Sequence, residues 1–318
     1  MTIGHNKIRK TFLELAQSHK LPQTMLFYGL AGIGKKRIAL DLVSHLFCAN
    51  PPAQHSSPQA CGVCQACLML GQNNHPDCFL IAPTPPKSQG DKPVNATSLD
   101  VQPNWTIKTD QFKALRNKLI YHPLMAKHQV VLIDDAEKMT TATANSLLKI
   151  LEEPRPHQIF ILITAQTNKI LPTIRSRCAK YYFSPLTDQE AKQIIVAQAE
   201  DTSLPDEATL SFLVRCFQGS ITNTLKALQS SDLLDFLRTL TAPALSFRQL
   251  AAHSKKLATS DQDLNIFLQC LNHYCLEQQK QTTNIKPEAL AFFEKIRQAQ
   301  RQLSKHIPKD FVLENLFM

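Results

Sequence analysis

A glycine-rich segment, GLAGIGKK over residues 29–36, carries the residue types that bind phosphate groups. It matches the pattern G-x-x-x-x-G-K, in which backbone N–H groups at a helix start hold the phosphates and the lysine reaches the terminal ones. The loop glycines are Gly29, Gly32 and Gly34, and the lysine is Lys35. A serine or threonine that ligates magnesium should follow, but Lys36 stands there. The residues predict a phosphate loop that does not bind Mg-ATP productively; a loop that keeps only its shape, or holds a bare anion, is the alternative.

Two adjacent carboxylates, Asp134 and Asp135, follow the apolar run 130–133. In phosphate-loop ATPases the first such residue holds the magnesium shell, and the second, usually glutamate, polarises the attacking water. Asp135 is one methylene shorter than glutamate, which sets its carboxylate back by about 1 Å, enough to weaken the positioning of a water. Both residues could instead cap a helix that starts near Ala136, because a helix dipole favours acidic groups there. The residues alone favour neither role.

Four cysteines, Cys48, Cys61, Cys64 and Cys67, form the pattern C-x12-C-x2-C-x2-C. Four thiolates can close a tetrahedral zinc site, and no ligand position then stays open for chemistry. Ferredoxin-like iron–sulfur sites also use C-x2-C-x2-C, but they continue with a fourth cysteine where Gly71 stands. Unrelated buried thiols are the third alternative. The spacing predicts one structural zinc ion in a module over residues 48–67.

The elements that position these residues follow from hydrophobic patterning. A strand over 25–28 precedes the glycine loop, and a helix with Ile38, Leu42 and His45 on one side follows it. Further strands are expected over 79–82, 130–133 and 159–164, and helices over 8–18, 110–120 and 143–151. Because the strands are almost wholly apolar, they predict a parallel sheet with helices on both faces, which is an α/β fold. Residues 83–105 are expected to form a long, solvated and mobile loop.

Composition limits the class of protein. Hydrophobic residues make up 43% and charged residues 19% of 318 residues, as in a globular protein, and the longest apolar runs are too short to span a membrane. The start of the chain lacks a signal peptide, so we expect a cytoplasmic protein whose nine cysteines are thiols or metal ligands. The net charge of +9 suits work near nucleic acid, but no dense basic block indicates direct reading of DNA sequence.

The second half of the chain is expected to be helical throughout. Leu264, Phe267, Leu268 and Leu271 share one helical face, and Gly219 and the polar residues 230–232 are candidate joints. We therefore expect a phosphate-loop domain over 1–183, a small helical domain over 184–229 and a C-terminal helical domain over 230–318.

Taken together, these residues resemble the delta-prime family of bacterial DNA polymerase III clamp-loader subunits, which are AAA+ proteins. The matching stretches are 29–35, the cysteine module 48–67, His75-Pro76-Asp77, 130–139, 145–154 and Ser176-Arg177-Cys178. They keep the family's order over about the first 185 residues. The runs LLKILEEP and SRC are the most specific of them.

The resemblance implies several expectations. Arg177 would project into the ATP site of a neighbouring subunit, and Thr164 would stand at the position called sensor 1, where it could equally cap a turn. Active relatives carry an arginine after a Gly-Ser, whereas Ile221 and Thr222 follow Gly219-Ser220. The helical parts would be a lid and an oligomerising collar.

The partners implied are gamma/tau-type ATPase and delta-type subunits in a hetero-pentamer, with the sliding clamp and primed DNA. Two alternatives stay open at this point. The chain could be an ATPase competent in its own site, with metal held by Asp134 alone. Its zinc module could also be a DNA- or protein-binding platform on an AAA+ scaffold.

Overall fold

The structure is a computed structural model that describes residues 3–51, 60–85, 105–198, 204–240, 261–281, 287–304, 312–313 and 315–316. It divides into two compact units, Met1–Pro185 and Leu186–Met318. The finer limits expected at residues 183 and 229 stay predictions.

The first unit is built on a parallel sheet of five strands, in the order β2-β3-β4-β1-β5. The strands are β1 (Thr24–Gly29), β2 (Cys78–Ile81), β3 (Gln129–Ile133), β4 (Gln158–Thr164) and β5 (Ala179–Phe183). In β1, Met25 pairs with Ile161 of β4 on one side and with Ala179 of β5 on the other. The predicted parallel α/β fold is confirmed, and β5 is a strand that sequence patterning missed.

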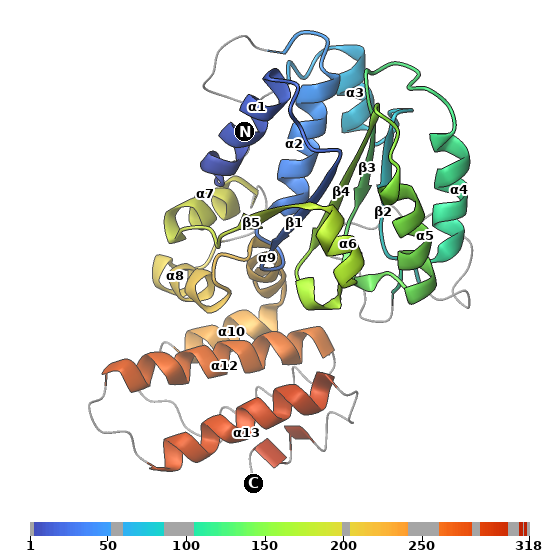
Figure 1. Ribbon diagram of the computed structural model, residues 1–318. Coiled ribbons are helices and arrows are strands. Elements are labelled where there is room, and N and C mark those ends of the chain that lie inside the picture. Colours follow the sequence, from blue (N-terminus) through green and yellow to red (C-terminus); the bar gives the residue numbers. More distant parts are fainter. Residues whose placement is uncertain are drawn as a thin grey trace. The chain divides into compact units, whose positions relative to one another are not determined.

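Helices cover both faces of this sheet because successive strand residues point to opposite sides. Val131 and Phe160 pack with α4 (Thr109–Leu119), α5 (Thr141–Glu152) and α6 (Pro172–Arg177), whereas Val130 and Ile161 pack with α1 (Asn6–Gln17) and α2 (Lys35–Phe47). Figure 1 shows the two layers of helices on either side of the strands. A central strand such as β4 is therefore buried along its whole length.

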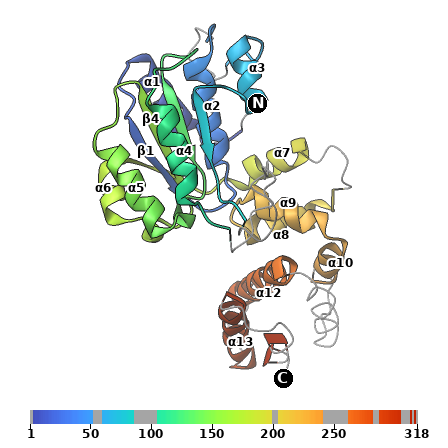
Figure 2. The ribbon, with the colours of Figure 1, turned by 90° about the vertical axis from the view of Figure 1, so that its right-hand side faces the viewer.

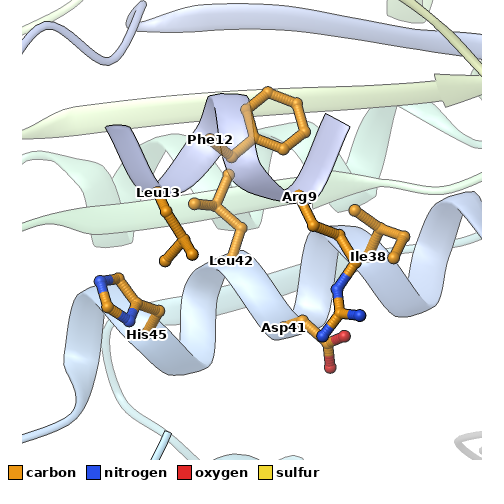
Figure 3. Close-up of a pocket in the computed structure, with 7 residues that line it drawn as sticks. All are labelled: Arg9, Phe12, Leu13, Ile38, Asp41, Leu42 and His45. Carbon is orange, nitrogen blue, oxygen red and sulfur yellow. The ribbon is translucent and has the colours of Figure 1, made fainter. Parts of the chain in front are cut away.

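The seam between α1 and α2 holds a small, mostly apolar cavity (Figure 3). Phe12 and Leu13 of α1 and Leu42 of α2 line it, with the guanidinium of Arg9 beside the carboxylate of Asp41. Burial lowers the pKa of Arg9, and Asp41 partly restores it. The volume open to water is about 10 Å³, which is at the limit of what one water molecule needs. The seam is therefore packing rather than a ligand site.

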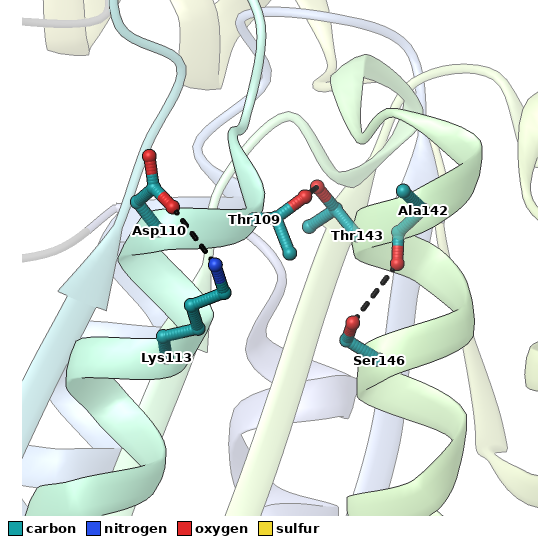
Figure 4. A network of polar contacts seen from close by, with 6 residues as sticks. All are labelled: Thr109, Asp110, Lys113, Ala142, Thr143 and Ser146. Carbon is teal, nitrogen blue, oxygen red and sulfur yellow. Dashed lines mark hydrogen bonds and ion pairs between the residues drawn. The ribbon is translucent and has the colours of Figure 1, made fainter.

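Polar contacts tie α4 to α5 (Figure 4). The hydroxyls of Thr109 and Thr143 lie 3.4 Å apart, and the Thr143 hydroxyl also donates to the carbonyl of Ile107 at 3.1 Å. Thr140 caps α5 by accepting from the Thr143 N–H at 3.2 Å. On the solvent side, Lys113 donates to Asp110 at 3.4 Å. The contacts of Thr143 with Thr109 and Ile107 therefore join the start of α5 to the start of α4.

The described part of the second unit contains helices and no strand. They are α7 (Asp188–Gln198), α8 (Glu207–Cys216), α9 (Ile221–Gln229), α10 (Ser231–Leu240), α12 (Asp261–Gln281) and α13 (Pro287–Ser304). Figure 2 shows α12 and α13 side by side. The predicted face of α12 is confirmed, since Leu264, Phe267, Leu268 and Leu271 are all 0% exposed in one core. Gly219 ends the turn after α8 with a φ of +76°.

Most of the loop expected over 83–105 lies outside the described residues. At its ends, Thr84 and Thr106 exchange backbone hydrogen bonds of 2.9 and 3.1 Å. Trp105 is only 7% exposed, so the prediction of a solvated segment is wrong at that residue. Among the helices that the structure describes, none combines the length and the apolar character that crossing a membrane requires.

Candidate functional site

The carboxyl ends of parallel strands meet at one edge of a sheet, which is where α/β proteins place their ligands. The glycine loop begins where β1 ends, Asp134 directly follows β3, and Thr164 is the last residue of β4. The structure thus gathers the predicted loop, carboxylates and threonine at the same edge. We call this group of residues the phosphate-loop edge.

The glycines of the loop have backbone conformations that suit a tight turn. Gly32 and Gly34 have φ of +74° and +97°, and Gly34 directly precedes α2. Gly29 has a φ of +151°, and a Cβ there would lie 2.3 Å from the carbonyl oxygen of Phe183 in β5. The loop therefore runs close against the neighbouring strand, and only glycine fits at its first position.

Lys35 folds back onto the loop itself. Its ammonium donates to the carbonyl of Gly29 at 2.9 Å and to that of Leu30 at 2.5 Å, and the residue is 6% exposed. Burial lowers the pKa of Lys35 to about 8, while Glu137 and the two aspartates of this edge oppose the change. The phosphate-binding lysine is thus satisfied by its own backbone.

Lys36 makes the central contact of the edge. Its ammonium lies 2.9 Å from the Oδ2 atom of Asp134, with side chains 24% and 11% exposed. The other oxygen of Asp134 accepts the N–H of Asp135 at 3.2 Å. Both carboxylate oxygens are therefore engaged by the protein. A magnesium ion in such a site is held by phosphates, waters and one or two protein oxygens. Here a lysine stands at the hydroxyl position and pairs with the carboxylate, so these residues do not supply the protein ligands that Mg-ATP would use.

Asp135 has an unusual backbone and a perturbed carboxyl group. Its φ of 46° lies in the left-handed region. Burial raises the pKa of Asp135 to about 6, and the negative charges of Asp134 and Glu137 add to this effect. The helix that follows is a single 3-10 turn, Ala136–Lys138, and the Asp135 side chain donates or accepts no capping bond there. The capping alternative is wrong for this residue.

Glu137 is a residue of this edge that sequence reasoning missed. Its Oε1 atom accepts the N–H of Ala165 at 3.1 Å, which joins the end of β3 to the end of β4. Thr164 is 1% exposed, and its hydroxyl accepts the N–H of Gln166 at 3.0 Å. The Thr164 hydroxyl therefore holds a turn, which is the alternative to the sensor role in the sequence analysis. In the sequence, Glu137 could have been identified from the acidic residues Asp134 and Asp135 just before it.

Arg177 lies at the opposite edge of the sheet from the phosphate loop. It is the last residue of α6, and the hydroxyl of Thr24, the first residue of β1, donates to its carbonyl at 2.5 Å. Its guanidinium donates to the carbonyl of Thr173 and to the carboxylate of Glu152, both at 3.0 Å. The side chains of this ion pair are 38% and 52% exposed. Arg177 is therefore paired on the surface and remote from its own loop.

The four predicted cysteines come together after α2. Their sulfur atoms all lie within 4.8 Å of one another, and those of Cys61 and Cys67 are 4.0 Å apart. Four sulfurs around a zinc ion at 2.3 Å would be about 3.8 Å apart. The N–H of Cys61 points at the sulfur of Cys48, and that of Cys64 at the sulfur of Cys61, both at 3.3 Å. The group fits one tetrahedrally held metal ion.

The thiols of this cluster differ in acidity. Backbone N–H groups lower the pKa of Cys64 to about 6, whereas burial and the neighbouring Cys64 raise the pKa of Cys67 to about 12. Several thiolates so close together repel one another unless a cation lies among them. A bound ion would remove that conflict, because a coordinating thiol is deprotonated outright.

Asp77 has a structural role that its sequence context did not reveal. It is 1% exposed, and its carboxylate accepts the N–H groups of Leu124, Met125 and Ala126 at 2.7, 2.8 and 2.9 Å. This single side chain thereby fixes the loop between α4 and β3. Its neighbour His75 accepts the Asp77 N–H at 3.2 Å. Asp77 of the His-Pro-Asp stretch thus anchors this loop.

Comparison with known proteins agrees with this arrangement. The model of the family "DNA polymerase III, delta subunit" matches residues 4–187. DNA polymerase III subunit delta' of Pseudomonas aeruginosa is 36% identical over 182 residues, which are 57% of this chain and 48% of that protein. Subunit gamma/tau of Mycobacterium tuberculosis is 30% identical over 227 residues, or 71% of this chain and 36% of the relative. The chain thus spans between about a third and about half of the length of these relatives.

A crystal structure supports the fold. A DNA polymerase III gamma subunit-related protein from Thermotoga maritima superimposes with a TM-score of 0.53 and 16% identity, covering 96% of this chain and 97% of that one. The parallel sheet, the glycine loop after β1 and the acidic residues after β3 are the features of a phosphate-loop fold. The chain belongs to the DNA polymerase III delta-subunit family, and its relatives include the delta' subunits of that polymerase.

Proposed function

We propose that this chain is a delta-prime-type subunit of the DNA polymerase III clamp loader that does not hydrolyse ATP itself. It helps to load the sliding clamp onto primed DNA, within a cytoplasmic hetero-pentamer of gamma/tau-type and delta-type subunits. The observation that carries the proposal is the contact between Lys36 and Asp134, which occupies the ligands that a catalytic magnesium would need. The helices of residues 184–229 and 230–318 serve as lid and collar.

Arg177 is the residue that the chain lends to a neighbour. Strand β1 separates it from its own phosphate loop, and the five steps from Thr24 to Gly29 correspond to about 17 Å at roughly 3.3 Å per residue. Its bond to Glu152 is an exposed ion pair, worth about 0–1 kcal/mol. The guanidinium can therefore exchange this partner for a phosphate of an adjoining subunit at little cost. An arginine so placed contributes roughly 10³ to 10⁵ in rate to phosphoryl transfer.

The metal of the cysteine cluster is zinc in this proposal. Thiolate ligands in a closed set of four favour zinc, and they leave no position for substrate. The ion would join the end of α2 to α3 (Gln65–Gly71) and supply folding energy to this part of the first unit. Chemistry by the metal is not part of the proposal.

The test is the ATPase rate of a clamp loader reconstituted with Arg177→Ala. We expect a fall of at least tenfold at the neighbouring site, with assembly of the complex unchanged by gel filtration. Arg175→Ala, on the same helix, is the matched control and should leave the rate within twofold. Glu152→Ala removes only the intrachain pair and should not lower the rate. Unchanged hydrolysis with Arg177→Ala would contradict the role of this arginine.

A further inference from the structure

The Lys36–Asp134 contact lies where phosphate-loop chemistry requires a divalent cation. Asp134 is the first carboxylate after β3, and Lys36 takes the place of the hydroxyl ligand at the start of α2. The two groups meet at 2.9 Å, the distance of a direct charge-assisted hydrogen bond. The Lys36 ammonium therefore already places a positive charge at the Asp134 carboxylate. This charge belongs to a side chain of the protein itself.

We propose that the Lys36 ammonium is a built-in substitute for the divalent cation, so that the phosphate-loop edge keeps its arrangement without magnesium and binds none. The inference rests on the proposed function, because it explains how a non-hydrolysing subunit keeps the architecture of an ATP site. It extends that function by assigning an occupant to the cation position. The occupant is a side chain of the same protein.

The charges of the edge agree with this assignment. Three carboxylates, those of Asp134, Asp135 and Glu137, act on the buried ammonium of Lys35. The second ammonium, that of Lys36, offsets one of them directly. Without Lys36, three carboxylates would face a single ammonium, and such a group attracts a divalent ion. With Lys36 in place, an arriving cation meets a neutralised Asp134 and a like charge beside it.

Lys35 completes the self-contained arrangement. Its ammonium is held by the carbonyls of Gly29 and Leu30 rather than left pointing into an open loop. Glu137 is likewise engaged, by the N–H of Ala165. Lys35, Lys36 and Asp134 therefore have partners from their own chain, and one oxygen of Glu137 has one as well, whereas the buried Oε2 atom of Glu137 accepts no hydrogen bond among the described residues.

The test replaces Lys36 by the residue that the phosphate-loop pattern expects. Lys36→Thr removes the ammonium and supplies a hydroxyl, so this variant should gain a response to magnesium alone. We expect 10 mM Mg²⁺ to raise its unfolding midpoint by about 3 °C or more if the ion is at least tenfold above its Kd. Hydrogen exchange in the peptide 129–137 should slow at the same time. The zinc-loaded wild type should show neither effect.

Two further variants make the result specific. Lys36→Thr combined with Asp134→Asn should lose the magnesium response, since the carboxylate ligand is gone. Lys36→Arg keeps a cation at the site and should behave as the wild type does. Magnesium stabilisation of the wild type equal to that of Lys36→Thr would overturn the proposal, and so would a folded Lys36→Thr protein without any response.

A second measurement covers the case in which Lys36→Thr does not fold. Electron paramagnetic resonance of Mn²⁺ added to zinc-loaded wild-type protein should show the free ion at millimolar concentration. Tight Mn²⁺ binding that Asp134→Asn abolishes would overturn the proposal in the native chain. This outcome is independent of the Arg177→Ala assay, which reports on a neighbouring subunit. The two proposals can therefore fail separately.

Discussion

The hydroxyl of Thr24 donates a hydrogen bond to the carbonyl of Arg177, so Arg177 is fixed where β1 begins. The phosphate loop starts at the other end of the same strand, after Gly29. Strand β1 is thus followed by the glycine loop at its carboxyl end and is bonded to Arg177 of α6 at its amino end. This separation is what the proposed function requires, because it keeps Arg177 away from the chain's own loop and leaves it available to a neighbouring subunit.

The carboxyl group of Asp135 gives a prediction about pH. Its pKa is raised from 3.8 to about 6 in the folded chain, mainly by burial. An acid with a raised folded-state pKa destabilises the fold once it ionises, so stability falls as pH rises from about 4 to 6 and stays lower above that range. Asp135→Asn removes this penalty and suits the left-handed backbone at that position.

We therefore expect Asp135→Asn to stabilise the protein by about 1–3 kcal/mol at pH 8 and by almost nothing at pH 4. Urea denaturation at the two pH values measures this difference. The exposed Asp110→Asn is the control, and it should change stability by less than about 0.5 kcal/mol at either pH. A destabilised Asp135→Asn at pH 8 would show that the carboxylate is a favourable part of the edge.

The cysteine cluster predicts one bound metal ion for each chain. Cys64→Ser removes one of four ligands, so the metal content after dialysis should fall from about one equivalent to near zero. Elemental analysis by mass spectrometry gives both the amount and the identity of the metal. Cys275→Ser, a cysteine outside the cluster, should keep the full equivalent. Full metal retention by Cys64→Ser is the result that would exclude a four-cysteine site.

The buried carboxylate of Asp77 predicts a local loss of stability. Asp77→Ala leaves the N–H groups of Leu124, Met125 and Ala126 without their acceptor. Hydrogen bonds to a charged group contribute about 1.5–3 kcal/mol each, but not additively, so we expect a total loss of about 2–4 kcal/mol.

Hydrogen exchange locates this effect within the chain. Amides 124–126 should exchange at least tenfold faster in Asp77→Ala, whereas exchange in α5 should change little. Asp110→Ala removes an exposed carboxylate of the same kind and is expected to leave both regions as they are. Equal acceleration across the whole first unit would mean that Asp77 supports the fold generally rather than this loop.

The sequence predicted the parts of this molecule that depend on local patterns. Apolar runs located β1 to β4 within about one residue, because strands buried on both faces carry few polar residues. The cysteine cluster was equally predictable, since three of its ligands lie within seven residues. Strand β5 was missed because it lies at the edge of the sheet, where Tyr182 is 56% exposed and Lys180 interrupts the apolar pattern.

The contacts that define the site depend on tertiary structure. Lys36 and Asp134 are almost a hundred residues apart, and they meet only because the sheet order brings β3 and the start of α2 to one edge. The substitution at Lys36 was visible in the sequence, but the partner of its ammonium was not. The role of Asp77 was hidden for the same reason, since its three acceptor bonds reach residues 124–126.

The close approach of Gly29 to Phe183 has a consequence for how such a motif is lost over time. In the proposed function, phosphate chemistry is lost through the residue at Lys36, while the sheet and the loop keep their arrangement. A chain cannot replace Gly29 so easily, because a side chain there would collide with the backbone of β5. We therefore expect Gly29 to be retained even in a chain that no longer binds nucleotide. A glycine at this position in a relative indicates that β1 and β5 pack closely there. It does not indicate whether that relative binds ATP.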